Sequence, residues 1–234
     1  MDESAQLHVR AVVFDVGETL IDETREYGTW ADWLGVPRHT FSAVFGAVIA
    51  TGRDYRETFQ VFRPGFRLDD ERHRRVEQGC AETFDAGDLY PDALPALGEL
   101  KRLGYQIGVA GNQTERAHDL LLGLGLPVDW IATSSRWGVE KPRAAFFERI
   151  ASTCACHPSE VAYVGDRLDN DILPAKAAGL RTVFIRRGPW GTWVAEEGGA
   201  GPADVRINTL MELPGILLLP TMGESTDSGA GRVR

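Results

Sequence analysis

Short apolar runs that alternate with helical patterns constrain the fold of this chain most strongly. The runs are rich in β-branched residues and end at turn residues, as buried strands do, and they cover residues 9–14, 105–110, 128–133, 160–165 and 181–185. Between the runs, apolar residues recur at helical spacing, as at Leu94, Leu97 and Leu100. Strands that alternate with helices favour a parallel sheet covered by helices on both faces. The sequence therefore predicts an α/β fold.

The interval from Asp22 to Asp88 interrupts this alternation. It contains no run typical of a buried strand, and its aromatic and aliphatic residues have helix-like spacing. We interpret residues 22–88 as a helical insertion after the first strand, which leaves residues 1–21 and 89–220 for the α/β core. Residues 221–234 are rich in Gly, Ser and Thr and predict a disordered tail.

The charge balance narrows the range of partners. The 234 residues include 25 Lys and Arg against 34 Asp and Glu, a net charge of −9, which is the wrong sign for binding nucleic acid or an anionic membrane surface. We also find no apolar run long enough for a membrane span and no pattern of a signal peptide at the acidic N-terminus. The odd set of three cysteines is typical of a reducing compartment, so the expected location is the cytoplasm.

Carboxylates follow two of the predicted strands directly. Asp15 ends the run Val12-Val13-Phe14, and Gly165-Asp166 ends another run and is followed by Asp169 and Asp171. In an open parallel sheet, ligands bind at the carboxyl ends of the strands. Clustered carboxylates repel one another unless a cation compensates them, and Mg²⁺ is the simplest candidate. Asp169 or Asp171 could instead cap the helix that follows.

Two further polar residues lie between these carboxylates in the sequence. Asn112 follows the predicted strand 105–110, and Lys141, one of only three lysines in the chain, precedes Pro142. Each has an ordinary alternative explanation, since Gly111-Asn112 is also a common turn and a lysine is most often a surface residue.

The order of these segments resembles the haloacid dehalogenase-like hydrolase superfamily over roughly residues 9–190. The most specific part of the match is Asp171 to Val183, which is similar to the fourth motif of that superfamily and the strand beyond it. The insertion at residues 22–88 lies where many members carry a cap. The resemblance implies a Rossmann-like core with an α-helical cap.

The resemblance also implies roles for the residues quoted above. Asp15 would be the nucleophile that forms an aspartyl-phosphate, and Lys141 would neutralise its charge. Asn112 and the backbone beside it at Gly111 would bind the phosphoryl oxygens. Asp15, the carbonyl oxygen of Gly17, Asp166 and either Asp171 or Asp169 would hold Mg²⁺. The implied substrate is a small phosphorylated metabolite.

Two positions depart from the phosphatase pattern. Gly17 stands where a second aspartate usually serves as general acid and base, and Gly111 stands where a hydroxyl usually binds phosphate. General acid–base catalysis contributes about 10²–10⁴-fold, so we expect slow turnover of alkyl phosphates unless another residue takes this role. Glu23, Glu26 and Tyr27 are the candidates, provided that the start of the insertion folds over the site.

These departures leave other functions open. A non-catalytic protein that binds a phosphorylated ligand or a protein partner would not need the missing groups. Halide-removing members of the superfamily also lack the second aspartate, although a 2-haloacid dehalogenase does not need the metal site that Asp166 and Asp171 indicate. Phosphonate cleavage would normally require a lysine in the cap, and residues 22–88 contain none.

Three other features are interpreted as structural. The stretch from Arg53 to Glu77 contains seven arginines and six acidic residues, which is typical of a solvated helical face, although one or two of these arginines could reach a substrate. Cys154, Cys156 and His157 could ligate zinc, but no second pair of ligands accompanies them. Trp190 and Trp193 are expected to pack at the rim of the core.

Overall fold

A computed structural model describes residues 7–196 and 201–218 of the chain. Its centre is a six-stranded sheet with the order β4-β3-β2-β5-β6-β7, in which every pair of neighbours is parallel. The strands are β2 (Ala11–Phe14), β3 (Gln106–Gly111), β4 (Trp130–Thr133), β5 (Val161–Gly165), β6 (Arg181–Ile185) and β7 (Val205–Ile207). The predicted parallel α/β core is confirmed, and β7 is a strand that the sequence patterns missed.

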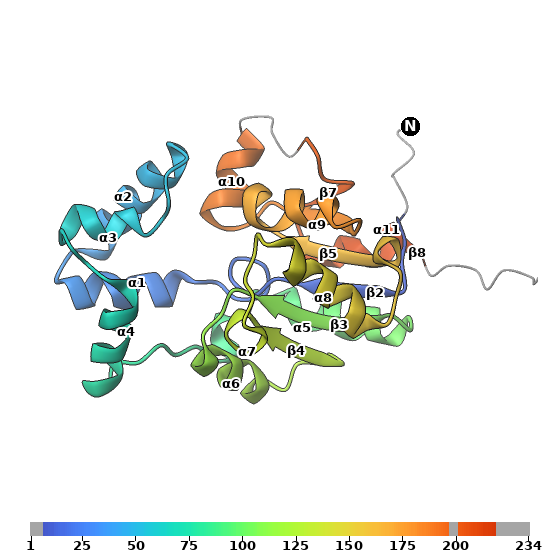
Figure 1. Ribbon diagram of the computed structural model, residues 1–234, viewed down its shortest axis with the longest axis horizontal. Coiled ribbons are helices and arrows are strands. Elements are labelled where there is room, and N and C mark those ends of the chain that lie inside the picture. Colours follow the sequence, from blue (N-terminus) through green and yellow to red (C-terminus); the bar gives the residue numbers. More distant parts are fainter. Residues whose placement is uncertain (1–6, 197–200, 219–234) are drawn as a thin grey trace, which may run out of the picture.

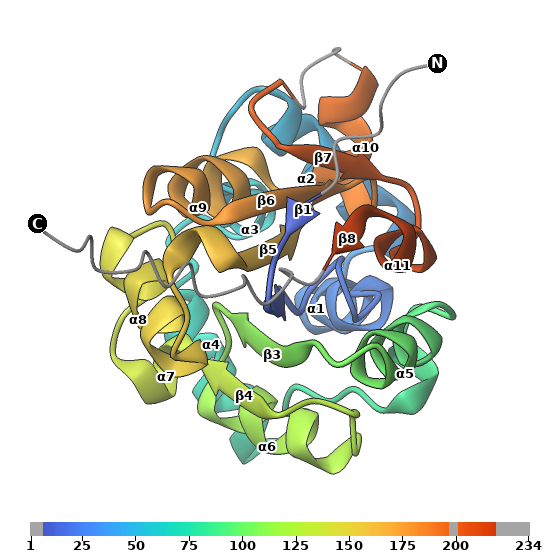
Figure 2. The same cartoon turned by 90° about the vertical axis from the view of Figure 1, so that its right-hand side faces the viewer.

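Helices cover both faces of this sheet (Figure 2). Leucines of α5, α6 and α11 pack against one face, and Phe146, Phe147 and Ile150 of α8 pack against the other together with α9. The core helices are α5 (Ala93–Arg102), α6 (Glu115–Gly123), α7 (Ser134–Trp137), α8 (Ala144–Cys154), α9 (Leu173–Ala177), α10 (Gly188–Glu196) and α11 (Leu213–Ile216). Side chains of the central strands are buried on both faces, which explains the continuous apolar runs in the sequence.

A second, two-stranded sheet joins segments near the two ends of the described chain. In it β1 (Leu7–His8) pairs in parallel with β8 (Leu217–Leu218). Strands of two residues are too short for an alternating pattern to be recognised, so sequence analysis could not predict them. The tail predicted for residues 221–234 lies outside the described residues.

Four helices form the predicted α-helical cap, on one side of the sheet in Figure 1. They are α1 (Thr24–Leu34), α2 (Arg38–Ala50), α3 (Glu57–Phe62) and α4 (Leu68–Glu77). Their shared core is aromatic, with Trp30, Phe41 and Phe59 buried at its centre. That residues 22–88 act as a separate domain stays a prediction.

The expectation of a solvated charged face from Arg53 to Glu77 is wrong for two residues. Arg75 is buried, with its guanidinium 4.0 Å from the centre of the Trp30 ring and an ion pair to Glu26 at 3.1 Å. Glu71 is also buried and accepts a hydrogen bond from the indole of Trp33 at 2.8 Å. A charged side chain can be buried when such partners replace water, and composition alone cannot show those partners.

Strand register places the candidate site. Phe14 at the end of β2 pairs with Val109 of β3 and with Val164 of β5. Because the three strands run in the same direction, the residues that follow them emerge at one edge of the sheet. Asp15, Asn112 and Asp166 therefore start from neighbouring strand ends.

Candidate active site

Three buried carboxylates meet at the carboxyl edge of the sheet. Asp15 follows β2, Asp166 follows β5, and Asp171 lies in a helical turn, Leu168–Ile172, that leads into α9. One oxygen atom from each lies within 4.8 Å of the others. All three residues are buried, so bulk water screens their mutual repulsion poorly.

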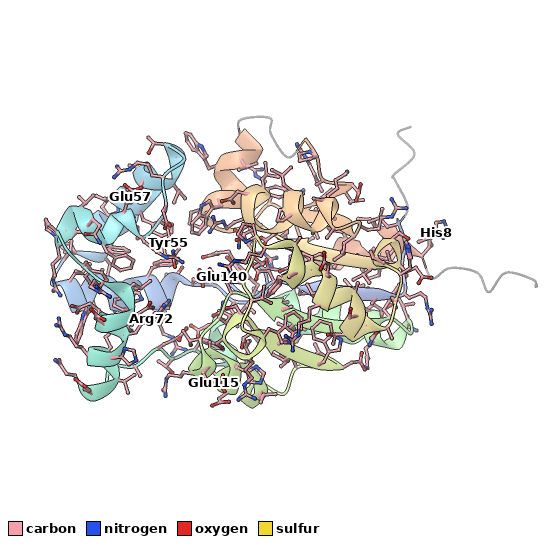
Figure 3. All side chains as sticks on the ribbon, viewed as in Figure 1. His8, Tyr55, Glu57, Arg72, Glu115 and Glu140 are labelled. Atoms are coloured by element: carbon pink, nitrogen blue, oxygen red, sulfur yellow. The ribbon has the colours of Figure 1, made fainter. Side chains whose placement is uncertain are left out.

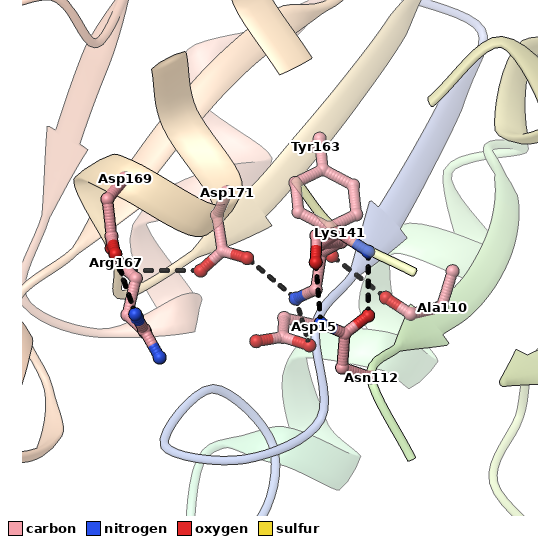
Figure 4. Close-up of polar contacts among 8 residues, drawn as sticks. All are labelled: Asp15, Ala110, Asn112, Lys141, Tyr163, Arg167, Asp169 and Asp171. Atoms are coloured by element: carbon pink, nitrogen blue, oxygen red, sulfur yellow. Dashed lines mark hydrogen bonds and ion pairs between the residues drawn. The ribbon is translucent and has the colours of Figure 1, made fainter. Parts of the chain in front are cut away.

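The ammonium group of Lys141 lies between two of these carboxylates (Figure 4). Its Nζ is 2.7 Å from Oδ1 of Asp15 and 2.6 Å from Oδ1 of Asp171. The side chain is only 1 % exposed, so both ion pairs lie in a poorly solvated environment, where charge interactions are strong. One ammonium group therefore compensates part of the charge of three carboxylates.

Asn112 and Tyr163 hold Lys141 in place, a role that sequence analysis missed. The amide of Asn112 donates to the carbonyl oxygen of Lys141 at 3.0 Å, and its Oδ1 accepts from the backbone N–H of Lys141 at 2.8 Å. The buried ring of Tyr163 lies 5.6 Å from the Lys141 ammonium, and its hydroxyl donates to the carbonyl of Ala110 at 2.8 Å. The side chain of Asn112 is thus engaged with the backbone, and its binding of phosphoryl oxygens stays a prediction.

The structure separates the roles of Asp171 and Asp169, which the sequence left open. Asp171 is fully buried, and its Oδ2 accepts a hydrogen bond from the backbone N–H of Arg167 at 3.0 Å. Asp169 is exposed and forms an ion pair with the guanidinium of Arg167 at 2.7 Å. Neither aspartate caps α9, whose N-cap residue is Ile172 and has no side-chain cap. Only Asp171 belongs to the buried cluster.

Burial and the repulsion between neighbouring carboxylates raise the pKa values of Asp166 and Asp171. Burial, together with the charges of Asp171 and Asp15, raises the pKa of Asp166 well above its ordinary value. Burial likewise raises the pKa of Asp171 to about 6, even though Lys141 opposes this shift. Burial opposes the charge of Lys141, but Asp15 and Asp171 raise its pKa above the ordinary value, so the lysine stays protonated.

The cluster has the properties of a site for a hard divalent cation. Oδ2 of Asp166 is buried and has no hydrogen-bond partner within the part of the chain that the structure describes. Buried polar atoms without a partner are rare, and an ion is one of the groups that satisfy them. Carboxylate oxygens are the ligands that Mg²⁺ prefers. The absence of a side chain at Gly165 also matters, because a Cβ there would lie 2.5 Å from Oδ2 of Asp171.

The two glycines that depart from the phosphatase pattern lie against carboxylates. A Cβ on Gly111 would lie 2.7 Å from Oδ1 of Asp15 and 3.1 Å from Cγ2 of Val16. A Cβ on Gly17 would lie 2.5 Å from Oε1 of Glu23. Burial, followed by the charges of Glu18 and Asp15, raises the pKa of Glu23 well above its ordinary value. Glu23 therefore belongs to the electrostatic environment of the cluster.

Comparison with known families agrees with this geometry. The haloacid dehalogenase-like hydrolase family matches residues 9–179, well over half of the chain. The chain belongs to this family.

Its relatives in this family include named phosphatases. A glyceraldehyde 3-phosphate phosphatase of Pyrococcus abyssi is 31 % identical over 199 residues, which cover 77 % of this chain and 82 % of the relative. Another, of Methanocaldococcus jannaschii, is 35 % identical over 55 % of this chain and 56 % of its own length. A phosphoserine phosphatase of Thermus thermophilus is 29 % identical over 61 % of this chain and 57 % of its own length. The match to the Methanocaldococcus enzyme thus spans about half the length of that relative.

Solved structures of the family share the fold. The magnesium-bound HAD hydrolase YfnB of Bacillus subtilis has a TM-score of 0.66 at 18 % identity, over 89 % of this chain and 98 % of that one. A dehalogenase has a TM-score of 0.63 at 22 % identity, over 93 % of this chain and 98 % of that one. At these identities the likeness establishes the fold alone.

A cavity of about 860 Å³ lies between the core and the cap, beside the buried carboxylates. Its walls include Asp15, Gly17 and Glu23 on the side of the buried carboxylates, and Tyr55 and Arg72 on the side of the cap helices. Figure 3 shows Tyr55 and Arg72 on the side of the cap that faces the core, across from Glu140. The cavity is large enough for a small metabolite.

The tryptophans after β6 differ in their surroundings. Trp190 packs against the cap, with ring centres 5.1 Å from Phe45 and 6.0 Å from Tyr55. Trp193 is exposed. Trp190 therefore joins core to cap, which goes beyond the rim packing expected from the sequence.

Two remaining expectations concern metal ligands and membranes. Over residues 7–196 and 201–218, Asp15, Asp166 and Asp171 are the only group of His, Cys, Asp or Glu side chains close enough to hold a metal ion, so Cys154, Cys156 and His157 do not form such a group. Within the same residues, none of the helices is both long and apolar enough to cross a bilayer.

Proposed function

We propose that this protein hydrolyses small phosphorylated molecules in a Mg²⁺-dependent reaction that passes through an aspartyl-phosphate on Asp15. One observation carries this proposal: Lys141 bridges Asp15 and Asp171, while the buried Asp166 beside them keeps an oxygen that has no hydrogen-bond partner among the described residues. Phosphoryl transfer depends mainly on positioning and on charge compensation, which such a cluster supplies.

Each residue of the cluster then has a chemical task. A carboxylate oxygen of Asp15 attacks phosphorus as the bond to the leaving oxygen breaks, and water later releases phosphate from Asp15. The ammonium of Lys141 compensates the charge that the phosphoryl group brings beside Asp15. A bound Mg²⁺, held by Asp15, Asp166, Asp171 and the carbonyl oxygen of Gly17, would supply further positive charge to the phosphoryl oxygens.

The substrate class follows from the cavity and from the relatives. The named relatives act on glyceraldehyde 3-phosphate and phosphoserine, which are small phosphorylated molecules. One N–H of the Asn112 amide donates to Lys141, and its second N–H and the backbone at Gly111 are the proposed partners of the phosphoryl oxygens. Gly111 leaves space for Asp15, which a hydroxyl-bearing side chain would crowd.

Dehalogenation is the weaker alternative. Dehalogenases are among the structural neighbours, but they establish the fold alone. A neutral carbon–halogen bond brings no charge that requires Asp166 and Asp171 beside Asp15. The three buried carboxylates favour a reaction at a charged phosphoryl group together with a divalent cation.

The test is turnover of 4-nitrophenyl phosphate with and without Mg²⁺, for the wild type, Asp15→Asn and Asp169→Asn. We expect Mg²⁺-dependent turnover that Asp15→Asn abolishes. Asp169→Asn is the matched control, because this exposed carboxylate pairs with Arg167 outside the cluster. Turnover that survives in Asp15→Asn would exclude Asp15 as the nucleophile. A wild type that releases halide from 2-chloropropionate but no phosphate would establish dehalogenation, and Mg²⁺ binding without turnover would favour a binding protein.

A further inference from the structure

The carboxyl group of Glu23 occupies the space where the missing general acid would lie. A Cβ built on Gly17 would lie 2.5 Å from Oε1, 2.6 Å from Cδ and 3.0 Å from Oε2 of Glu23. A side chain at residue 17 would therefore begin in the volume that this carboxyl group now fills. Glu23 also lines the cavity, as does Asp15.

Glu23 lies at the start of the cap, and the turn after β2 brings it to this position. After β2 the backbone turns through residues 17–21, where Gly17 and Ile21 form an isolated β-bridge. Glu23 then immediately precedes α1, and its carbonyl oxygen accepts from the N–H of Tyr27 at 3.0 Å. The backbone N–H of Glu23 donates to Oε1 of Glu18 at 3.4 Å. Glu23 is thus anchored through its backbone.

The carboxyl group itself is left available. Among the described residues, no donor is hydrogen-bonded to the side-chain oxygens of Glu23, whereas neighbouring acidic groups are engaged. The hydroxyl of Tyr90 donates to Oε2 of Glu18. Arg75 and Thr29 bind the two oxygens of Glu26. Tyr27 packs its ring against Phe45, with centres 4.6 Å apart. Glu23 and Tyr27 both line the cavity, but of the candidates named from the sequence it is the Glu23 carboxyl that lies against Gly17.

We propose that Glu23 is the general acid and base of the reaction, in place of an aspartate at position 17; this inference rests on the proposed function. In the first step, the protonated carboxyl gives its proton to the leaving oxygen as the O–P bond breaks and the Asp15–P bond forms. In the second step, the Glu23 carboxylate takes a proton from the water whose oxygen attacks phosphorus as the Asp15–P bond breaks. Phosphate leaves, and the acid form of Glu23 is restored.

The experiment compares two substrates of similar shape. The leaving group of 2,4-dinitrophenyl phosphate departs without a proton, whereas that of phenyl phosphate needs one. In Glu23→Gln, we expect the first turnover of phenyl phosphate to fall by about 10²–10⁴-fold. With 2,4-dinitrophenyl phosphate, we expect a nearly unchanged burst of phenolate, followed by slow turnover and a phosphorylated enzyme detectable by intact-protein mass spectrometry.

Four further variants separate catalysis from structure. Glu26→Gln is the matched control, one turn along α1, and should leave the ratio of the two first-turnover rates unchanged. Glu23→Asp keeps a shorter carboxyl and should lie between the wild type and Glu23→Gln. Gly17→Asp combined with Glu23→Ala moves the carboxyl to position 17 and should cleave phenyl phosphate faster than Glu23→Ala alone. Gly17→Asp alone pushes the Glu23 carboxyl aside and is not a clean test.

The outcomes distinguish this inference from the proposed function. Equal losses on both substrates in the first turnover of Glu23→Gln, with a wild-type melting curve, would show a structural role and overturn the inference while the phosphatase remains. Wild-type rates on phenyl phosphate in Glu23→Gln would overturn it as well. A wild type that turns over neither phosphate ester, with or without Mg²⁺, would overturn the proposed function and this inference together.

Discussion

Replacing Lys141 by Met tests how much the stability of the folded protein depends on this single buried ammonium group. Methionine keeps an apolar, unbranched stem beside Tyr163 but removes the ammonium that contacts Asp15 at 2.7 Å and Asp171 at 2.6 Å. Removing one partner of a buried ion pair typically costs about 3–5 kcal/mol, because the remaining charge is left uncompensated. We expect Lys141→Met to lower the free energy of unfolding by this amount at pH 8 without Mg²⁺.

The loss in the free energy of unfolding caused by Lys141→Met should depend on pH in a defined direction. Burial raises the pKa of Asp171 to about 6, from an ordinary value of 3.8. The folded state therefore binds this proton more tightly than the unfolded chain does, which contributes stability below about pH 4 that is lost as the pH rises through 6. A shift of this size corresponds to about 3 kcal/mol. Without Lys141 the Asp171 carboxyl ionises at still higher pH, so the penalty of Lys141→Met should be small at pH 5 and largest at pH 8.

Urea denaturation in EDTA at pH 5 and pH 8 measures both effects. Lys176→Met is the matched control, because Lys176 pairs with Asp204 at 2.7 Å but is 45 % exposed, and exposed pairs contribute at most about 1 kcal/mol. A penalty for Lys141→Met no larger than that of Lys176→Met at pH 8 would refute the reasoning. So would a penalty that shrinks as the pH rises.

Two other substitutions probe the metal site and the junction of core and cap. Asp166→Asn removes the buried carboxylate whose Oδ2 has no hydrogen-bond partner within residues 7–196 and 201–218. We therefore expect a higher melting temperature in EDTA and a loss of the melting shift on adding Mg²⁺; an unchanged Mg²⁺ shift would contradict the proposed ligand set. Trp190→Ala removes two aromatic contacts to the cap, each contributing about 0.5–1.5 kcal/mol beyond the burial of the ring, so calorimetry should show a loss of at least about 1–3 kcal/mol. Exposed Trp193→Ala should show much less, and an equal loss in both variants would exclude the proposed contact.

The fold was predictable where the sequence pattern is long and regular. The apolar runs from Ala11 to Phe14 and from Val161 to Gly165 are strands buried on both faces, so every residue in them carries the pattern. β7 and the β1–β8 pair were missed because a strand of two or three residues is too short to show periodicity. The buried Arg75 was missed because its environment comes from Trp30 and Glu26, 45 and 49 residues away in the chain.

The residue types of the site could also be predicted from the sequence, but their spatial arrangement could not. Asp15 and Asp166 each follow an apolar run, and that is a local signal. The choice between Asp171 and Asp169 depends on the direction in which a helical turn points each side chain, and Asn112 proves to hold the backbone of Lys141. No spacing in the sequence shows these contacts.

The sequence by itself determined the alternation of strands and helices, because apolar periodicity is a local property of the chain. That alternation predicts parallel strands, and with them the sheet edge at which Asp15 and Asp166 emerge. Only the tertiary structure decided that Lys141 lies between two carboxylates and that Glu23 fills the space beside Gly17. Both facts depend on distances in space between segments of the chain, and no local sequence pattern shows such distances. These distances determine how deeply each group is buried and which charges lie beside it, and therefore which groups can react.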